Sequence, residues 1–222
     1  IPPAGIKPGK KNLFYNESHH AWREELKKFV AKEIIPFVEE WEEAGEFPRE
    51  LYKKAGDFGL LGMGYPEELG GTSEGIDIFH GIVTAEEIAQ GCGGVAASLL
   101  SLNISLPLIM ALGTEEQKKK YIPPVIAGDK IACLGVTEPS GGSDVAGIKT
   151  KAVRDGDEFV INGSKMFITS GMRADYYVIA CRTGGPGTSG ISAIVVEKGM
   201  AGFTQTPLKK MGWLSSDTAA LY

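Results

Sequence analysis

The sequence predicts an α+β protein, with a helical first half followed by a second half built from short β-strands. Apolar residues recur at helical spacing through the first half. Short β-branched runs, separated by turns rich in Gly, Pro, Ser and Thr, fill the second half. The change falls near Asp129. We therefore expect a leader over residues 1–17, a helical domain over 18–130 and an antiparallel barrel or sandwich over 131–222.

The helical half opens on an amphipathic stripe, for which Ser18 is the expected N-cap and which Pro36 should interrupt. The residues of this stripe are Trp22, Leu26, Phe29, Val30, Ile34, Phe37, Val38 and Trp41. A capping box of Thr114 and Gln117 should start a last helix that ends by Gly128. Between them, helices are expected over 48–59, 76–89 and 95–112, the last apolar on nearly all sides and therefore buried.

The second half alternates short apolar runs with turn signals. The dipeptide Asn162–Gly163 predicts a hairpin that joins strands at 158–161 and 165–169. The other expected strands are 131–136, 149–154, 176–182, 191–197, 203–207 and 218–222. Because the sequence stops at Tyr222 inside an expected strand, we expect it to be a fragment.

Composition excludes several functional classes. The formal net charge of −5 gives no general attraction to nucleic acid or anionic membranes. The three cysteines form no CxxC pair, which argues against a zinc knuckle and favours a reduced, intracellular protein. There is no signal-peptide pattern and no run of eighteen apolar residues, so no membrane span is expected. His19, His20 and His80 are expected on a solvated surface and a helix face, without a metal set.

A polar loop follows the expected strand at 131–136. Residues 134–147 read LGVTEPSGGSDVAG, in which two adjacent glycines let backbone N–H groups approach a ligand closely. The hydroxyl and amide groups suit a phosphate or the edge of a heterocycle, although an ordinary turn has the same composition. Neither GxGxxG nor a Walker A lysine is present, so this is neither a Rossmann nor a P-loop fingerprint.

Four stretches together resemble the acyl-CoA dehydrogenase family. Residues 135–147, GVTEPSGGSDVAG, resemble the hallmark segment of that family. Residues 59–71, GLLGMGYPEELGG, resemble the loop after its second helix. Residues 165–171, KMFITSG, resemble its strand with an aromatic-Ile-Thr triplet, and 211–221, MGWLSSDTAAL, resemble its MGxxxSDT segment. Their order and spacing also agree, so the resemblance covers residues 18–222.

The resemblance implies that FAD lies against the loop and the triplet. Thr137 and the backbone around Val136 would bond the isoalloxazine ring, and Thr169 would bring a hydroxyl near flavin N5. Ser143 would touch the pantetheine or the flavin pyrophosphate region. Phe167 stands where Trp is common, and it keeps the stacking surface without the indole N–H. The expected cofactor set is Leu134, Val136, Thr137, Gly142, Ser143, Phe167, Ile168 and Thr169.

The apolar segment 95–112 has two interpretations. Core packing explains it, and in the family the corresponding helix also lines the acyl pocket. The expected substrate-binding residues are Ser143, Leu99, Leu100, Leu102 and Asn103.

The reaction that the resemblance implies is α,β-dehydrogenation of a fatty acyl-CoA. A carboxylate base takes the α-proton, and the β-hydrogen leaves as hydride to flavin N5. The base is expected to be a Glu in a C-terminal helical domain beyond Tyr222, and Glu138 is expected to be structural. Electrons would pass to an electron-transferring flavoprotein, and a homotetramer is expected because in the family FAD lies partly across a subunit interface.

Other chemistries share this framework, including acyl-CoA oxidases, flavin monooxygenases, nitroalkane oxidases and alkylation-response proteins. The intact TEPSGGSD stretch favours the dehydrogenase. A flavin-free, truncated interaction module is a third alternative, and we expect the fragment alone to be inactive. The absence of a transit peptide favours a bacterial cytoplasm over a mitochondrial matrix.

Overall fold

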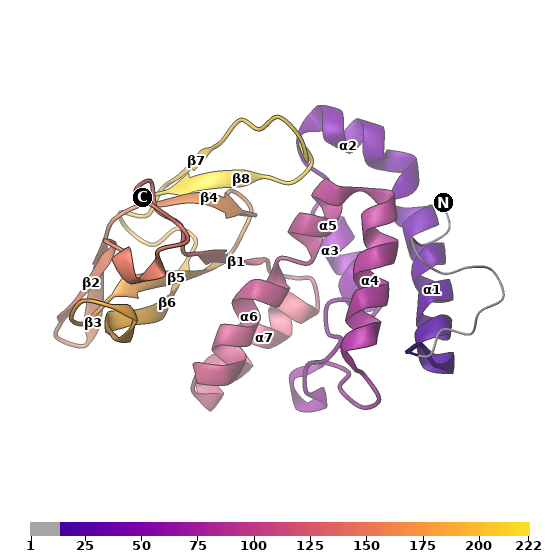
Figure 1. Ribbon diagram of the computed structural model, residues 1–222, viewed down its shortest axis with the longest axis horizontal. Helices are drawn as coiled ribbons and strands as arrows, with labels where there is room; N and C mark the ends of the chain where they lie inside the picture. The colour runs from indigo at the N-terminus through magenta and orange to yellow at the C-terminus, as the bar shows by residue number, and fades with distance from the viewer. Residues whose placement is uncertain (1–13) are drawn as a thin grey trace.

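The computed structural model describes residues 14–222, so most of the expected leader lies outside the described residues. Its helices are α1 (Glu17–Glu33), α2 (Val38–Ala44), α3 (Glu50–Asp57), α4 (Ile78–Gly91), α5 (Gly93–Leu99), α6 (Leu102–Leu112) and α7 (Glu115–Ile126). The strands are β1 (Ala132–Gly135), β2 (Lys151–Asp155), β3 (Glu158–Asn162), β4 (Lys165–Thr169), β5 (Tyr176–Arg182), β6 (Ile191–Glu197), β7 (Gln205–Pro207) and β8 (Thr218–Leu221). Figure 1 shows the helices on one side of the molecule and the strands on the other, which confirms the predicted α+β class.

The first helix begins earlier in the chain than expected, because its N-cap is not Ser18. Asn16 is the N-cap, because its side-chain oxygen accepts the His19 N–H at 3.1 Å and His19 Nδ1 accepts the Asn16 N–H at 3.0 Å. Ser18 donates its hydroxyl to Asn16 instead. The interruption at Pro36 is confirmed, since a 3-10 turn over Ile35–Phe37 separates α1 from α2.

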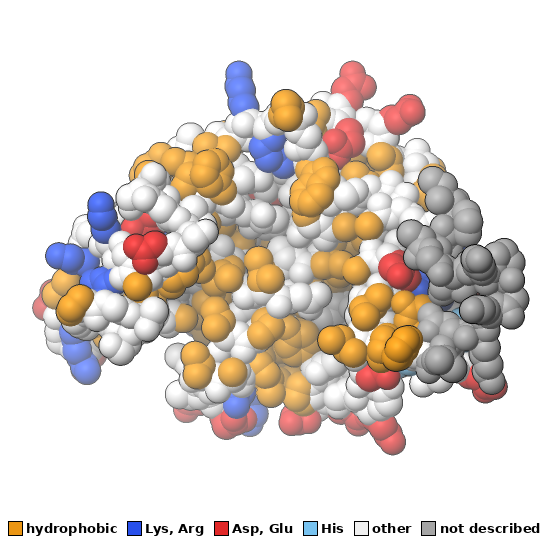
Figure 2. Space-filling model, in the orientation of Figure 1, with side chains coloured by type: hydrophobic (Ala, Val, Ile, Leu, Met, Phe, Trp, Pro, Cys, Tyr) orange, Lys and Arg blue, Asp and Glu red, His pale blue; other side chains and the backbone are white. Residues whose placement is uncertain are grey.

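The apolar segment 95–112 is two helices, which corrects the expectation of one. The break lies at Leu100 and Ser101, where the Ser101 hydroxyl turns to the Ala132 carbonyl at 3.4 Å. It is also not buried on all sides, because Ile104 is 55% and Leu112 77% exposed. Figure 2 shows hydrophobic side chains gathered on this face over α6 and α7. Residues Gly93–Leu112 have the length and composition of a membrane span, a criterion that core helices also meet, and 44% of that window is buried here.

The last helix begins as predicted. The Thr114 hydroxyl accepts the Gln117 N–H at 3.3 Å, and the Gln117 side chain accepts the Thr114 N–H at 2.9 Å. We expect Thr114→Ala to lower the free energy of unfolding by about 1 kcal/mol, the usual effect of losing an N-cap. Urea denaturation followed by circular dichroism measures it. Glu116→Ala, at an exposed position in the same turn, is the control, and an equal loss there would contradict the capping explanation.

The strands form two sheets. The larger sheet has the order β1-β5-β2-β3 with β6 also paired to β5, and the smaller has the order β4-β8-β7. β5 and β6 pair antiparallel along their whole lengths, whereas β1 and β2 run parallel to β5. The arrangement is therefore mixed, not purely antiparallel. The parallel pairing places the carboxyl end of β1, and the loop that follows it, beside the middle of β5.

The predicted hairpin at Asn162–Gly163 is wrong, because β3 and β4 belong to different sheets. At Gly163 the chain instead crosses closely over Thr150, whose Oγ1 would lie 2.4 Å from a Cβ at that position. A glycine is therefore needed for close approach and not for a two-residue turn. The hairpin of this region joins β2 to β3, with Gly156 in the left-handed conformation.

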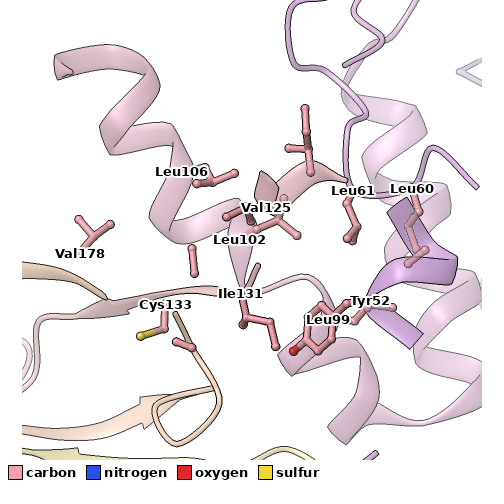
Figure 3. Packing of buried hydrophobic residues seen from close by; sticks show 14 of the residues in the cluster. Tyr52, Leu60, Leu61, Leu99, Leu102, Leu106, Val125, Ile131, Cys133 and Val178 are labelled. Atoms are coloured by element: carbon pink, nitrogen blue, oxygen red, sulfur yellow. The ribbon is translucent and has the colours of Figure 1, made fainter. Parts of the chain in front are cut away.

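One buried cluster runs through both halves. Figure 3 shows Leu102 and Leu106 of α6 and Val125 of α7 near Cys133 and Val178 of the sheet and Ile131, the residue before β1. Tyr52 of α3 and Leu61 of the turn after α3 complete it. Because this core is shared, the end of β1 and the α5–α6 junction are held in a fixed relation.

Candidate functional site

The polar loop after β1 lies against β4, the strand that carries the triplet Phe167–Thr169. The Met166 N–H donates to the Thr137 carbonyl at 2.8 Å, and within the loop Glu138 and Gly141 exchange backbone hydrogen bonds of 2.9 and 3.1 Å. Two segments about thirty residues apart in the sequence thus form one surface.

β4 carries a bulge at its centre. Its register against β8 shifts between Lys165 and Ile168, and Phe167 adopts a left-handed backbone with φ of 62°. The bulge turns Phe167 outward, where it is 68% exposed, and Ile168 inward, where it is 3% exposed. A left-handed backbone costs a non-glycine residue about 1–2 kcal/mol, and such strain is found mainly at functional sites. Phe167 is therefore held out from the sheet at an energetic cost.

A buried ion pair lies directly behind this surface. Lys165 Nζ is 3.0 Å from Glu138 Oε1, and both side chains are almost completely buried. Glu138 also accepts the N–H groups of Lys149 and Thr150, each at 2.8 Å. Burial alone would raise the pKa of Glu138, but the hydrogen bonds from Thr150, Lys149 and Lys165 outweigh it and lower the pKa to about 2.

This pKa predicts a pH dependence of stability. Because the pKa of Glu138 is about 2 in the folded chain and near 4.5 when unfolded, its ionised form favours folding. The contribution, on the order of 3 kcal/mol, is complete above pH 4.5 and is lost as the pH falls through 2. We expect Glu138→Gln to flatten the stability profile in that window, as measured by urea titrations at several pH values. A Gln variant whose profile stays parallel to wild type would contradict the assignment.

The α5–α6 junction lies beside the end of β4. The Ser101 hydroxyl is 3.3 Å from that of Ser170, the residue after β4, and Ser98 is 2.8 Å from Ser216. The four expected substrate positions from this region separate into two pairs. Leu99 and Leu102 point into the core (Figure 3), whereas Leu100 is half-buried and Asn103 is exposed.

Comparison with known proteins agrees with this geometry. Residues 16–129 match the family model of the acyl-CoA dehydrogenase N-terminal domain, and residues 133–222 match that of its middle domain. This chain belongs to the acyl-CoA dehydrogenase family. The mitochondrial long-chain specific acyl-CoA dehydrogenase of Rattus norvegicus is 43% identical over 219 residues, which are 96% of this chain and 50% of that protein. The chain thus spans about half the length of the curated relatives that it matches.

Two solved structures of acyl-CoA dehydrogenases share the fold closely. A putative acyl-CoA dehydrogenase from Mycobacterium smegmatis has a TM-score of 0.90 at 48% identity, over 95% of this chain and 55% of that one. A glutaryl-CoA dehydrogenase from the same organism, solved in complex with FADH2, has a TM-score of 0.86 at 31% identity. The matched region is 93% of this chain and 52% of the glutaryl-CoA dehydrogenase chain.

The expected cofactor-binding residues of the stretch 134–143 differ in exposure. Leu134, Val136, Thr137 and Gly142 are half-buried, and Ser143 is exposed. In the triplet, Thr169 is half-buried. The structure brings Thr137 and the triplet together through β4, and it connects the α5–α6 junction to them through Ser170.

Sequence reasoning missed the residues that hold this surface in place. Lys165 gave no signal, because a lysine at the start of a strand is usually solvated. Glu42 of α2 also went unnoticed, yet its carboxylate accepts the N–H groups of Leu214 and Ser215 at 2.9 and 3.0 Å. Asp217 fixes the turn after β4 by accepting the Met172 N–H at 2.8 Å. These contacts cross from one half of the chain to the other, and local patterns do not report them.

The expectation that His19 is solvated is wrong, because it is 1% exposed. His19, Asp77 and His80 lie together, with one possible ligand atom from each within 4.8 Å of the others. The Nδ1 atoms of both histidines accept backbone N–H groups at the starts of α1 and α4, at 3.0 and 3.2 Å. His19 Nε2 then carries the proton and donates to Asp77 at 2.8 Å. Both Nδ1 atoms are thus used by the capping boxes of α1 and α4, and Asp77 is itself the N-cap of α4, so this group serves helix capping.

Proposed function

We propose that this chain forms the cofactor-binding and acyl-binding part of an FAD-dependent acyl-CoA dehydrogenase of fatty-acid β-oxidation. One observation carries the proposal. The loop 134–143 and the triplet 167–169 form a single surface, and a strained backbone holds the aromatic ring of Phe167 out from it. A ligand that covers the ring would account for a large aromatic side chain held in water at a cost in backbone strain.

The loop has room for a flat cofactor edge. A Cβ at Gly142 would lie 3.0 Å from Thr137 Oγ1, so glycine lets the Thr137 hydroxyl sit against the backbone. Nothing lies within 4 Å of a Cβ at Gly141, which leaves that side of the loop open. When bound, FAD supplies the hydride acceptor. The relative solved with FADH2 supports this cofactor.

The chain's own residues take distinct roles in the proposal. Thr137 and the peptide after Val136 bond the isoalloxazine ring, together with Leu134 of β1 and Gly142 of the loop. Phe167 shields the ring from water, Ile168 supports the strand from the core, and Thr169 presents its hydroxyl to N5. Ser143, being exposed, contacts the pantetheine or the pyrophosphate. Leu100 and Asn103 face the acyl chain, and Leu99 and Leu102 support them from the core.

Glu138 does not serve as the proton-abstracting base. A base for the α-proton needs its pKa raised toward neutrality by a dry pocket, whereas the pKa of Glu138 is lowered to about 2. We propose that a Glu of the family's C-terminal helical domain abstracts the proton.

The substrate class, the electron acceptor and the assembly are proposed from the family and not from individual residues. The relatives above include a long-chain enzyme and a glutaryl-CoA enzyme, so we propose the acyl-CoA class without a chain length. We propose an electron-transferring flavoprotein as the electron acceptor and a homotetramer as the assembly. The relatives include mitochondrial and bacterial proteins, and we propose the bacterial cytoplasm.

The test uses the protein at its full natural length. We expect a yellow protein whose flavin band bleaches anaerobically with one or more members of an acyl-CoA panel. A colourless protein that cannot be reconstituted with FAD would overturn the proposal. Fast reoxidation by O2, with hydrogen peroxide as product, would assign it to the acyl-CoA oxidases instead. Residues 1–222 alone should show negligible turnover with an artificial acceptor.

A further inference from the structure

Two consecutive carbonyls of the loop are held by two consecutive residues of β4. Lys165 Nζ donates to the Val136 carbonyl at 2.9 Å, and the Met166 N–H donates to the Thr137 carbonyl at 2.8 Å. The Lys165 ammonium is 2% exposed and is neutralised by Glu138 at 3.0 Å. The contact with Val136 is the one that a side chain supplies, so substitution can remove it.

This contact sets the direction of a peptide group. In a trans peptide the N–H points opposite to the carbonyl of the preceding residue. Because the Val136 carbonyl turns toward the buried ammonium, the Thr137 N–H points away from the Glu138–Lys165 pair. Within residues 14–222 the ammonium is the side-chain donor that holds the Val136 carbonyl, whereas the next carbonyl, of Thr137, is held by the backbone of Met166.

Lys165 contributes orientation more than stability to this pair, because the hydrogen bonds from Thr150 and Lys149 stabilise ionised Glu138 more than Lys165 does. A buried ion pair usually adds little net stability compared with apolar side chains of the same volume, because both charges lose their hydration. Glu138 is already satisfied by the N–H groups of Lys149 and Thr150. The ammonium therefore does what an apolar side chain could not do, which is to hold the Val136 carbonyl.

We infer that Lys165 is a positioning residue of the cofactor site, which aims the Thr137 N–H at the flavin ring by holding the Val136 carbonyl. This inference rests on the proposed function. It assigns to Lys165 no contact with the cofactor or the substrate.

The test compares Lys165→Met with the double variant Glu138→Gln/Lys165→Met in the holoenzyme. Both lose the bond to Val136, but the double variant leaves no unpaired buried charge and regains stability. We expect both to bind FAD about tenfold more weakly, the effect of losing one hydrogen bond, and to shift the visible flavin spectrum. If Lys165→Met fails to fold, the double variant carries the test.

Arg23→Met is the matched control, because it breaks another buried pair, with Glu87 of α4, on the far side of the helical half. It should lower stability and leave FAD affinity and the flavin spectrum unchanged. If the double variant recovers both stability and the wild-type spectrum, Lys165 is only structural and the inference is overturned. A wild-type protein that takes up no FAD would instead overturn the proposed function itself.

Discussion

Gly128→Ala is expected to abolish folding or to lower the free energy of unfolding by about 4 kcal/mol or more. Gly128 follows α7 in a left-handed conformation with φ of 76°. A Cβ there would lie 2.1 Å from the Tyr52 carbonyl oxygen and 2.8 Å from Lys53 Cα, both backbone atoms of α3. Neither atom can move without shifting the whole helix. Thermal and urea denaturation, or loss of soluble protein, would report the effect.

Gly59→Ala separates the two causes. Gly59 also has a left-handed backbone, with φ of 83°, but nothing lies within 4 Å of a Cβ built there. Gly59→Ala should lower the free energy of unfolding by only about 1 kcal/mol, the cost of placing alanine in a left-handed backbone. If both variants lose the same amount of stability, the close approach of α3 and the end of α7 does not matter.

The local part of the fold could be predicted from the sequence. Hydrophobic periodicity and caps give the helices, because they depend on residues within one or two turns, and the Thr114 capping box is an example. The strands at 176–182 and 191–197 were predicted at the residues where β5 and β6 lie. Local signals failed where a tertiary contact decided the conformation. The Asn162–Gly163 turn is overridden by the crossing over Thr150.

The break inside the segment 95–112 has the same kind of cause. The apolar run gives no local signal that the helix is interrupted at Ser101, whose hydroxyl bonds Ala132 and Ser170. The parallel pairing of β1 with β5 was also beyond the sequence, because strand direction depends on which strands meet in space.

The resemblance to the family identified the loop 134–147 as a candidate site, and the structure gives the reason for the shape of that loop. Composition alone left residues 134–147 as a turn with room for a phosphate or a heterocycle. The backbone of β4 and the buried Lys165 show why this loop has one fixed shape. The bulge at Phe167 could not be foreseen, since strict two-residue alternation would have put Phe167 and Lys165 on the same side of the strand.

The same bulge leads to a prediction that separates stability from activity. Phe167→Gly should be more stable than Phe167→Ala by about 1 kcal/mol, because glycine adopts the left-handed backbone without strain and alanine does not. Both variants should lose turnover by about tenfold or more, since neither supplies an aromatic ring beside the cofactor. Thermal denaturation and steady-state dehydrogenation, measured on the same preparations of the protein at its full natural length, test the two halves of the prediction.

Phe167→Trp is the positive control, because it keeps a flat aromatic surface at the bulge and should retain turnover. Phe167→Gly and Phe167→Ala then show whether the strained backbone serves the aromatic ring or only the sheet. If Phe167→Gly is the more stable and remains as active as wild type, the aromatic ring has no role and the bulge is only a feature of the sheet. If Phe167→Gly is less active than wild type but more stable than Phe167→Ala, the left-handed backbone at Phe167 is maintained for the aromatic ring that it presents.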